Sequence, residues 1–272
     1  MSSISGLSPV SMFILDQKDE VTSATQWVKT DVSTLSNVEK FKAEAGSITS
    51  ADDLMGNYRA LSVVLGAYGL SSLQNSTALV KDLLTQNPSS SSSVAARSSN
   101  VSWLTFARAF SDWNSSSSDG SQPFDTADKI DAVVQKYEMN QYENSLNADN
   151  SGVGNALYFA RTMTASTSLA QVMGDSKLLK VVETVSGYDP TTFGALDYDQ
   201  QVRLLQKTFK SSDFSSPEKI QHYAERYLGM LQISPQTTTS PATLLTLYGS
   251  DGSGDPILSL FGATSSNLSS LF

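Results

Sequence analysis

The sequence predicts an all-α fold in which two related helical bundle repeats pack together, followed by an irregular polar C-terminal tail. Three observations predict this fold. Apolar residues recur at intervals of three and four, which is the spacing of one helix face. No run alternates apolar and polar residues convincingly enough to indicate a strand. Two blocks of sequence also recur in the same order along the 272 residues, as in proteins that repeat one structural unit.

The first repeated block begins at Ser50 and again at Ser168, 118 residues later. At the same offset, Phe41 falls on Phe159. Chance similarity is the alternative interpretation, because helical sequences share apolar spacing, but the matching order of the blocks favours a true repeat. The aligned pairs are Met55 with Met173, Gly56 with Gly174, Asn57 with Asp175, Arg59 with Lys177, Leu61 with Leu179 and Gly69 with Gly187.

The second repeated block has a smaller offset. Residues 127–130 match residues 217–220, 90 positions later, and Tyr137 matches Tyr227 at that offset. The offset is smaller because the first copy contains the longer internal loops. The two copies therefore have the same order of elements but different loop lengths.

The first copy carries the signals of a helix with a defined start and end. Ser50 with Asp53 indicates an N-cap followed by an acidic first turn. Gly69 lies where a left-handed residue ends a helix. We therefore expect one helix over 50–68, with Gly56 inside it at a close helix crossing. Its apolar face consists of Leu54, Tyr58, Leu61, Leu65 and Tyr68.

The second copy repeats these signals. Ser168 with Gln171 forms a capping-box pattern, and Gly187 marks the end. Leu179 corresponds to Leu61, and we expect both leucines to be buried on equivalent helix faces.

Further helices follow from the same spacing and capping rules. Ser216 followed by Pro217 indicates an N-cap and a proline in the first helical position. The remaining helices are expected over 19–35, 38–45, 76–85, 101–110, 126–146, 155–163, 198–209 and 217–231.

Polar segments divide the chain into three parts. The stretch 147–154 is polar, contains two glycines and separates the two copies. We expect an N-terminal helical repeat unit over 1–150, a second helical repeat unit over 151–233, and a tail rich in Ser, Thr and Gly over 234–272.

Composition excludes several classes of function. The net charge is −9, so the phosphates of a nucleic acid would be repelled and no nucleic-acid partner is expected. Cysteine is absent, which excludes disulfides and thiolate chemistry. No stretch approaches the ~18 consecutive apolar residues of a membrane span. Residues 1–15 lack the pattern of a signal peptide, so we expect a cytoplasmic protein or one exported without a cleaved Sec signal.

No catalytic or cofactor-binding residue can be assigned from motifs. His222 is the single histidine, and a catalytic base is one interpretation of it. Its counterpart in the first copy is Ala132, so a position on the surface of a helix is favoured. Gly152 and Gly154 do not form a dinucleotide-binding fingerprint, because the third glycine and a preceding strand are missing. We expect no cofactor.

No metal site is expected either. One loop loosely resembles a calcium-binding loop, but Tyr158 stands where a bidentate glutamate is needed. A second acidic stretch, 251–255, is followed by Pro256 where the loop requires glycine. The residues of the first loop are Asn147, Asp149, Ser151 and Gly152.

Several carboxylates lie on the expected helices. A pair of them could act as acid and base only if a cleft held them with separated pKa values. Solvated helix faces are the favoured interpretation. These residues are Asp52, Asp53, Asp128, Asp131, Glu138 and Glu143.

The repeated blocks resemble one bacterial family, the domain of unknown function numbered 1217. The resemblance extends over about 38–231. It implies a helical protein encoded among flagellar genes, and no catalytic residues that could be transferred to this chain. The Ser-rich loops of this sequence depart from the family pattern, where relatives tend to carry charge. The resembling segments are 47–61, 66–70, 94–97, 106–110, 155–159, 175–182 and 217–220.

The resemblance favours a non-enzymatic structural or assembly protein of the bacterial flagellum that acts through protein–protein contacts with flagellar or other components. Both a cytoplasmic location and export to the flagellum stay open. One alternative is a cytoplasmic chaperone or adaptor that binds a partner chain in a helical groove. Another is a hydrolase with an unrecognised carboxylate site. The sequence does not indicate the oligomeric state.

Short apolar clusters in the tail are the candidate partner-binding residues. They are too small to form a core, and they suit docking against a helical groove of a partner or of the protein itself. These residues are Ile257, Leu258, Leu260, Phe261, Leu268, Leu271 and Phe272.

Overall fold

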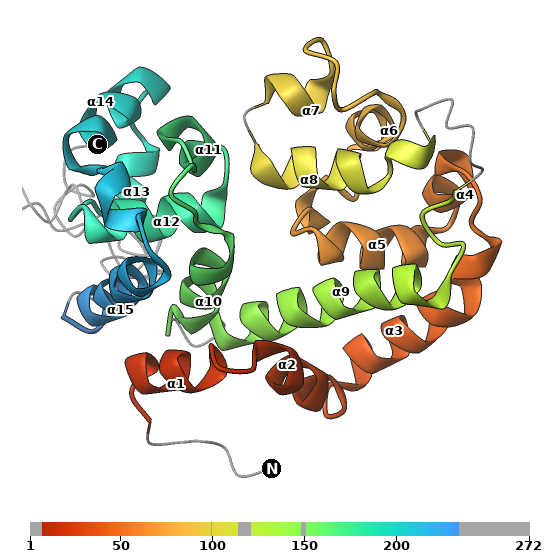
Figure 1. The fold of residues 1–272 in the computed structure, drawn as a ribbon, viewed down its shortest axis with the longest axis horizontal. Helices are drawn as coiled ribbons and strands as arrows, with labels where there is room; N and C mark the ends of the chain where they lie inside the picture. Colours follow the sequence, from red (N-terminus) through yellow and green to blue (C-terminus); the bar gives the residue numbers. More distant parts are fainter. Residues whose placement is uncertain (1–6, 99, 114–120, 148–150, 234–272) are drawn as a thin grey trace, which may run out of the picture. The chain divides into compact units, whose positions relative to one another are not determined.

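The computed structural model describes residues 7–98, 100–113, 121–147 and 151–233. Over these residues the regular elements are helices and no strand occurs, so the predicted all-α fold is confirmed (Figure 1). None of the described helices is long and apolar enough to cross a bilayer. The helices are α1 Pro9–Asp16, α2 Glu20–Val28, α3 Val32–Glu44, α4 Ala51–Gly56, α5 Tyr58–Ala67, α6 Thr77–Thr85, α7 Val94–Arg97, α8 Val101–Ala109, α9 Ala127–Asn147, α10 Val153–Thr162, α11 Leu169–Met173, α12 Ser176–Val185, α13 Pro190–Gly194, α14 Tyr198–Thr208 and α15 Pro217–Ile233.

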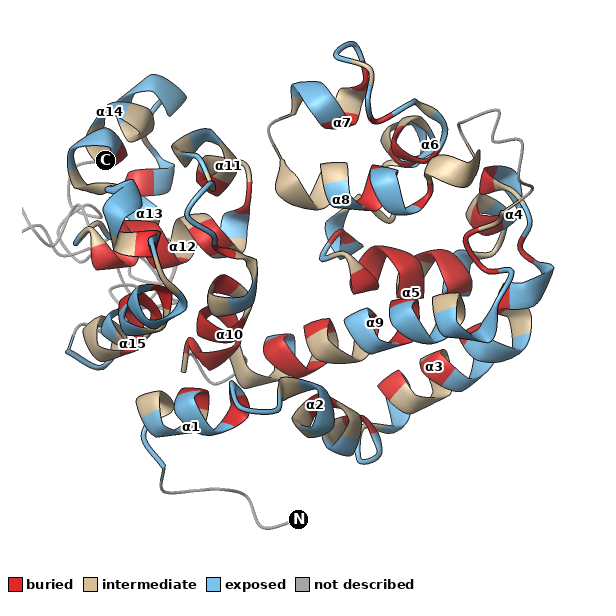
Figure 2. Cartoon of the chain, viewed as in Figure 1, coloured by how far each residue is buried: buried red, intermediate tan, exposed pale blue. Residues whose placement is uncertain are grey.

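Two hydrophobic cores stabilise these helices. The first is built from α3 to α9, and α5 is buried along most of its length within it (Figure 2). The second is built mainly from α10, α12 and α15, with Phe159 and Tyr227 fully buried. Helix α9 reaches both cores, since Tyr137 belongs to the first and Leu146 packs against the second.

The helix boundaries follow the sequence repeat. Helices α4 and α5 begin 118 residues before α11 and α12. An edge-to-face pair of Phe41 and Phe124, with ring centroids 5.6 Å apart, has its counterpart in Phe159 and Phe214 at 6.0 Å. These correspondences favour the repeat, while the superposition of the two copies stays a prediction, as does the division of the chain into repeat units.

The expected helix over 50–68 is wrong in one respect, because it is broken at Asn57. That residue has an extended backbone, and its side-chain oxygen accepts a hydrogen bond from the Ala60 N–H, so it caps α5. Gly56 therefore ends α4, and a Cβ added there would meet nothing within 4 Å. The expected close crossing at Gly56 is also wrong.

Other local expectations need correction. Tyr58 stands at the first position of α5 and is 71% exposed, so it does not belong to the apolar face. Leu61 is buried, whereas Leu179 is only half-buried and its neighbour Leu178 fills the core. The expected helix over 19–35 is two helices, because Asp31 caps a new one.

Helix α1 was not expected from the sequence. Ser8 caps it by accepting from the Ser11 N–H, and Pro9 occupies its first position. Phe13 projects from it into the second core and is fully buried. A segment from the start of the chain therefore completes the core of the second copy.

Candidate functional site

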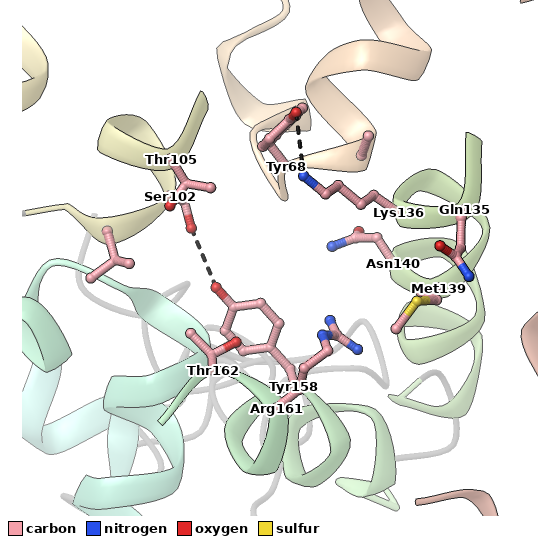
Figure 3. Close-up of a pocket in the computed structure, with 12 residues that line it drawn as sticks. Tyr68, Ser102, Thr105, Gln135, Lys136, Met139, Asn140, Tyr158, Arg161 and Thr162 are labelled. Carbon is pink, nitrogen blue, oxygen red and sulfur yellow. Dashed lines mark hydrogen bonds between the residues drawn. The ribbon is translucent and has the colours of Figure 1, made fainter. Parts of the chain in front are cut away.

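A cleft of about 350 Å³ lies between α5, α8, α9 and α10 (Figure 3). Its volume is in the range of pockets that bind small molecules. Lys136 and Asn140 extend into it from one face of α9, and Tyr158 and Arg161 from α10. Each pair is spaced by three or four residues, so one helix face presents both side chains.

Tyr158 forms a hydrogen-bonded wall of the cleft. Its hydroxyl donates to Asp175 Oδ2 at 2.6 Å, and Ser102 Oγ lies 3.3 Å from the same carboxylate. Asp175 also caps α12 by accepting from the Leu178 N–H. Burial, followed by the charge of Asp175, raises the pKa of Tyr158 above its usual range. The phenol therefore stays protonated and links α10 to α12.

An ion network centred on a buried carboxylate adjoins this wall. Glu143 of α9 is completely buried, with Arg161 at 2.6 Å and Lys177 at 3.2 Å from its two oxygens. Arg161 also binds Glu20 at 2.7 Å. Burial raises the pKa of Glu20 to about 7, against the lowering effect of Arg161. The network joins α2, α9, α10 and α12.

The position of Glu143 corrects the expectation of a solvated helix face. Gly154 lies against the backbone of Glu143, and a Cβ on this glycine would overlap the Glu143 carbonyl oxygen. Because the two backbones touch, α10 covers the Glu143 side chain. In the sequence, the signal for this contact is the pair Gly152 and Gly154, since a residue without a side chain allows two helices to approach closely.

The other predicted carboxylates do not enter the cleft. Asp52, Asp53, Asp128 and Asp131 are exposed, as expected for solvated helix faces. Glu138 is half-buried and accepts a hydrogen bond from Thr25.

His222 lies on the surface of α15. Its side chain is 76% exposed, and Nδ1 lies 3.0 Å from Glu225 Oε2. The surface position favoured by the sequence is therefore the observed one.

The segment that loosely resembles a calcium-binding loop begins at the end of α9 and continues to the start of α10. Asn147 Nδ2 donates to Asn155 Oδ1 at 3.0 Å, and the Ser151 hydroxyl donates to the Leu146 carbonyl. Gly152 has a left-handed backbone with φ of 74° at the start of α10. Asp149, the stretch 251–255 and the seven apolar tail residues lie outside the described residues. In the described part of the chain, no group of three His, Asp or Glu side chains could hold a metal ion.

A buried carboxylate in the second core was missed by sequence reasoning. Glu183 of α12 is 5% exposed, and it forms no ion pair with any described residue. Its counterpart in the first copy is the fully buried Leu65. Burial raises the pKa of Glu183 to about 7, while nearby Lys180 lowers it. A leucine-to-glutamate difference between the repeated blocks is the signal that could have found it.

Replacing Glu183 with leucine is expected to stabilise the protein more at pH 8 than at pH 4. The gain in the free energy of unfolding should be larger at pH 8 by about 1–2 kcal/mol. The raised pKa means that the native state holds a proton between about pH 4.5 and 7 that the unfolded state releases. Wild-type stability therefore falls as the pH rises through this window. Urea unfolding at both pH values measures the difference, with the exposed Glu39→Leu as control. Equal gains in the free energy of unfolding at the two pH values would contradict a raised pKa of Glu183.

The outward face of α1 is a second candidate site. Phe13 fixes the helix to the second core, while Leu7, Ile14 and Leu15 are 42%, 37% and 50% exposed. Ile14 and Leu15 are neighbours near the end of α1, and Leu7 lies just before Ser8, the residue that caps the start of the helix. Exposed apolar side chains gathered at one short helix make it a candidate surface for contact with another chain.

Comparison with known proteins places the chain in a family. The model of a family described as protein of unknown function (DUF1217) matches residues 67–220, more than half of the chain. The chain belongs to this family. The matched segment of this DUF1217 protein is shorter than the resemblance seen in the sequence and contains the cleft residues of α8, α9 and α10.

The fold of the DUF1217 protein is shared with a solved structure. A crystal structure of a protein from Agrobacterium tumefaciens has 22% sequence identity and a TM-score of 0.69. The similarity covers 86% of this chain and 99% of that one. At this identity the similarity shows the fold alone. A search of curated proteins found no match.

Proposed function

We propose that this DUF1217 protein acts without catalysis, as a structural or assembly component of the bacterial flagellum that works through protein–protein contacts. The flagellar setting comes from the resemblance of the sequence blocks to a family encoded among flagellar genes. The observation that supports a binding role is the exposure of three apolar side chains at α1: Ile14 and Leu15 on the helix and Leu7 just before it.

The occupant of this surface is the apolar side of an amphipathic helix from a flagellar partner. Ile14 and Leu15 provide two adjacent apolar anchors on α1, and Leu7 adds a third just before the helix, against which the apolar side of a second helix would pack. Each apolar side chain that becomes buried contributes roughly 25 cal/mol per Å². Since Phe13 already fixes α1 to the body of the protein, the surface is presented without ordering α1 at the moment of binding.

The contacts of the polar groups beside the cleft indicate that these groups stabilise the fold. Asp175 caps a helix, and Glu143 is held by Arg161 and Lys177. A hydrolase would need carboxylates that reach a substrate, and Glu143 is completely buried. A cytoplasmic chaperone or adaptor would use the same surface of α1. The location of the protein in the cell distinguishes this alternative from an exported flagellar component.

Deletion of the gene is expected to impair motility or filament assembly. Complementation with the double variant Ile14→Ser and Leu15→Ser should fail to restore motility, because the variant loses apolar contact area while Phe13 still holds the helix. The control is Val32→Ser at the start of α3, since Val32 is 79% exposed and lies away from α1. Normal motility in the deletion strain would contradict the flagellar role, and full restoration by the double variant would contradict the α1 surface.

The apolar clusters of the tail are a second surface that we expect to contact the partner. Removing residues 235–272 is expected to weaken capture of the partner and to leave the helical content of the protein, measured by circular dichroism, at the level expected for residues 1–234. Loss of that helical content would mean that the tail is part of the fold and would contradict the tail as a partner-binding segment.

A further inference from the structure

We propose that the cleft between α5, α8, α9 and α10 binds a small organic carboxylate with an apolar or aromatic body. This site is separate from the exposed side of α1. The proposal depends on two donors in the cleft that the protein leaves available, on the apolar walls beside them and on the volume of about 350 Å³.

The first available donor is the amide of Asn140. This residue is 5% exposed, and its Oδ1 accepts a hydrogen bond from Asn144 Nδ2 at 3.0 Å. Its own Nδ2 points away from α9 into the cleft and forms no hydrogen bond with any described residue (Figure 3). This N–H₂ group faces the cleft, so a bound acceptor there would gain a hydrogen bond that no described protein group competes for.

The second available donor is the ammonium of Lys136, one helical turn from Asn140. It lies 4.6 Å from the centre of the Tyr68 ring and 3.4 Å from the Tyr68 hydroxyl. None of the ion pairs among the described residues includes it. Partial desolvation lowers the pKa of Lys136. A carboxylate placed between this ammonium and the Asn140 amide would receive a charge-assisted hydrogen bond and a neutral one.

The remaining lining selects for an apolar body. Ala67, Val101 and Met139 contribute apolar surface, and the rings of Tyr68 and Tyr158 face the cleft from opposite sides. Aromatic walls favour a flat or branched apolar group through their area and ring geometry.

The charge balance favours a monoanion over a phosphate. The Arg161 guanidinium lines the cleft but is neutralised by Glu143 and Glu20, at 2.6 and 2.7 Å. Lys136 is then the cation left for a ligand, and one ammonium with one amide matches the two oxygens of a carboxylate. A dianion would need a second free cation.

Binding of phenylacetate to the full-length protein tests the proposal, measured by titration calorimetry or by ligand-observed NMR. We expect saturable binding that weakens at least tenfold in Lys136→Gln and in Asn140→Asp. The first change removes the positive charge, and the second replaces the amide donor by a carboxylate. Lys81→Gln is the control, because Lys81 pairs with Asp52 on an exposed surface. Neutral phenylacetamide and inorganic phosphate are expected to bind at least tenfold more weakly than phenylacetate.

Each result that would overturn the proposal is distinct. If phenylacetate does not bind when its concentration is about ten times that of the protein, with the protein at about 1 mM, the site is excluded. Equal binding of phenylacetamide would exclude recognition of the charge, and tighter binding of phosphate would exclude the carboxylate class. Asn140 is buried, so its variant could fail to fold, and thermal melting identifies that case. Lys136→Gln changes an exposed residue, so unchanged phenylacetate binding in this variant alone would be sufficient to overturn the proposal.

Discussion

Replacing Glu143 with glutamine is expected to lower the free energy of unfolding by about 3 kcal/mol. Glu143 is completely buried and balances the charges of Arg161 and Lys177, whose side chains are 37% and 21% exposed, so removing its charge leaves two partly solvated cations with too little compensation. The loss falls at the lower end of the range for broken buried pairs. Arg161 retains Glu20, and the charge of Glu143 no longer raises the pKa of Glu20.

Urea unfolding of wild type and variant measures this loss. The matched control is Glu39→Gln on the exposed side of α3, which should change stability by less than about 0.5 kcal/mol. Combining Glu143→Gln with Lys177→Met restores the balance of charges, so the double variant should lose less than the sum of the single losses. A loss below about 1 kcal/mol for Glu143→Gln would show that water reaches the carboxylate and that the network is not buried.

Replacing Gly154 with alanine is expected to cost about 3 kcal/mol, at the upper end for an added methyl group in a packed core. The new Cβ would overlap the Glu143 carbonyl oxygen, and it would lie 2.6 Å from the carbonyl carbon and 2.9 Å from Asn147 Nδ2. Backbone atoms cannot rotate away as a flexible side chain can. Helices α9 and α10 must therefore separate, which also pulls Arg161 from Glu143.

Gly56→Ala is the matched control for this substitution. A Cβ at Gly56 meets nothing within 4 Å, so alanine there should be neutral or should stabilise by up to about 1 kcal/mol. Urea unfolding compares the two variants. If Gly154→Ala were as mild as Gly56→Ala, the close contact between α9 and α10 would be disproved. A strictly additive loss when Gly154→Ala is combined with Glu143→Gln would contradict the coupling of this contact to the ion network.

Local signals in the sequence predicted much of the fold correctly. Ser50 and Ser168 cap helices through hydrogen bonds to backbone groups three residues away, and Gly69 and Gly187 have left-handed backbones after α5 and α12. The family model matches residues 67–220, which include the block that begins at Ser168. Asn57 is an exception. It lies within an apolar stripe that predicts one continuous helix, but in the structure it caps the start of α5.

The sequence by itself determined the all-α class and, to within two residues, the bounds of α6, α8, α9, α10, α14 and α15, because these depend on hydrogen bonds and spacing within a few residues. Only the tertiary structure decided where charges are buried. The Lys177 partner of Glu143 is 34 residues away along the chain, and Tyr142 bonds to Asp16 across 126 residues. The cleft arises in the same way, since its donors and walls come from four helices. Burial is a property of what packs against a residue, and helical periodicity does not specify that neighbour.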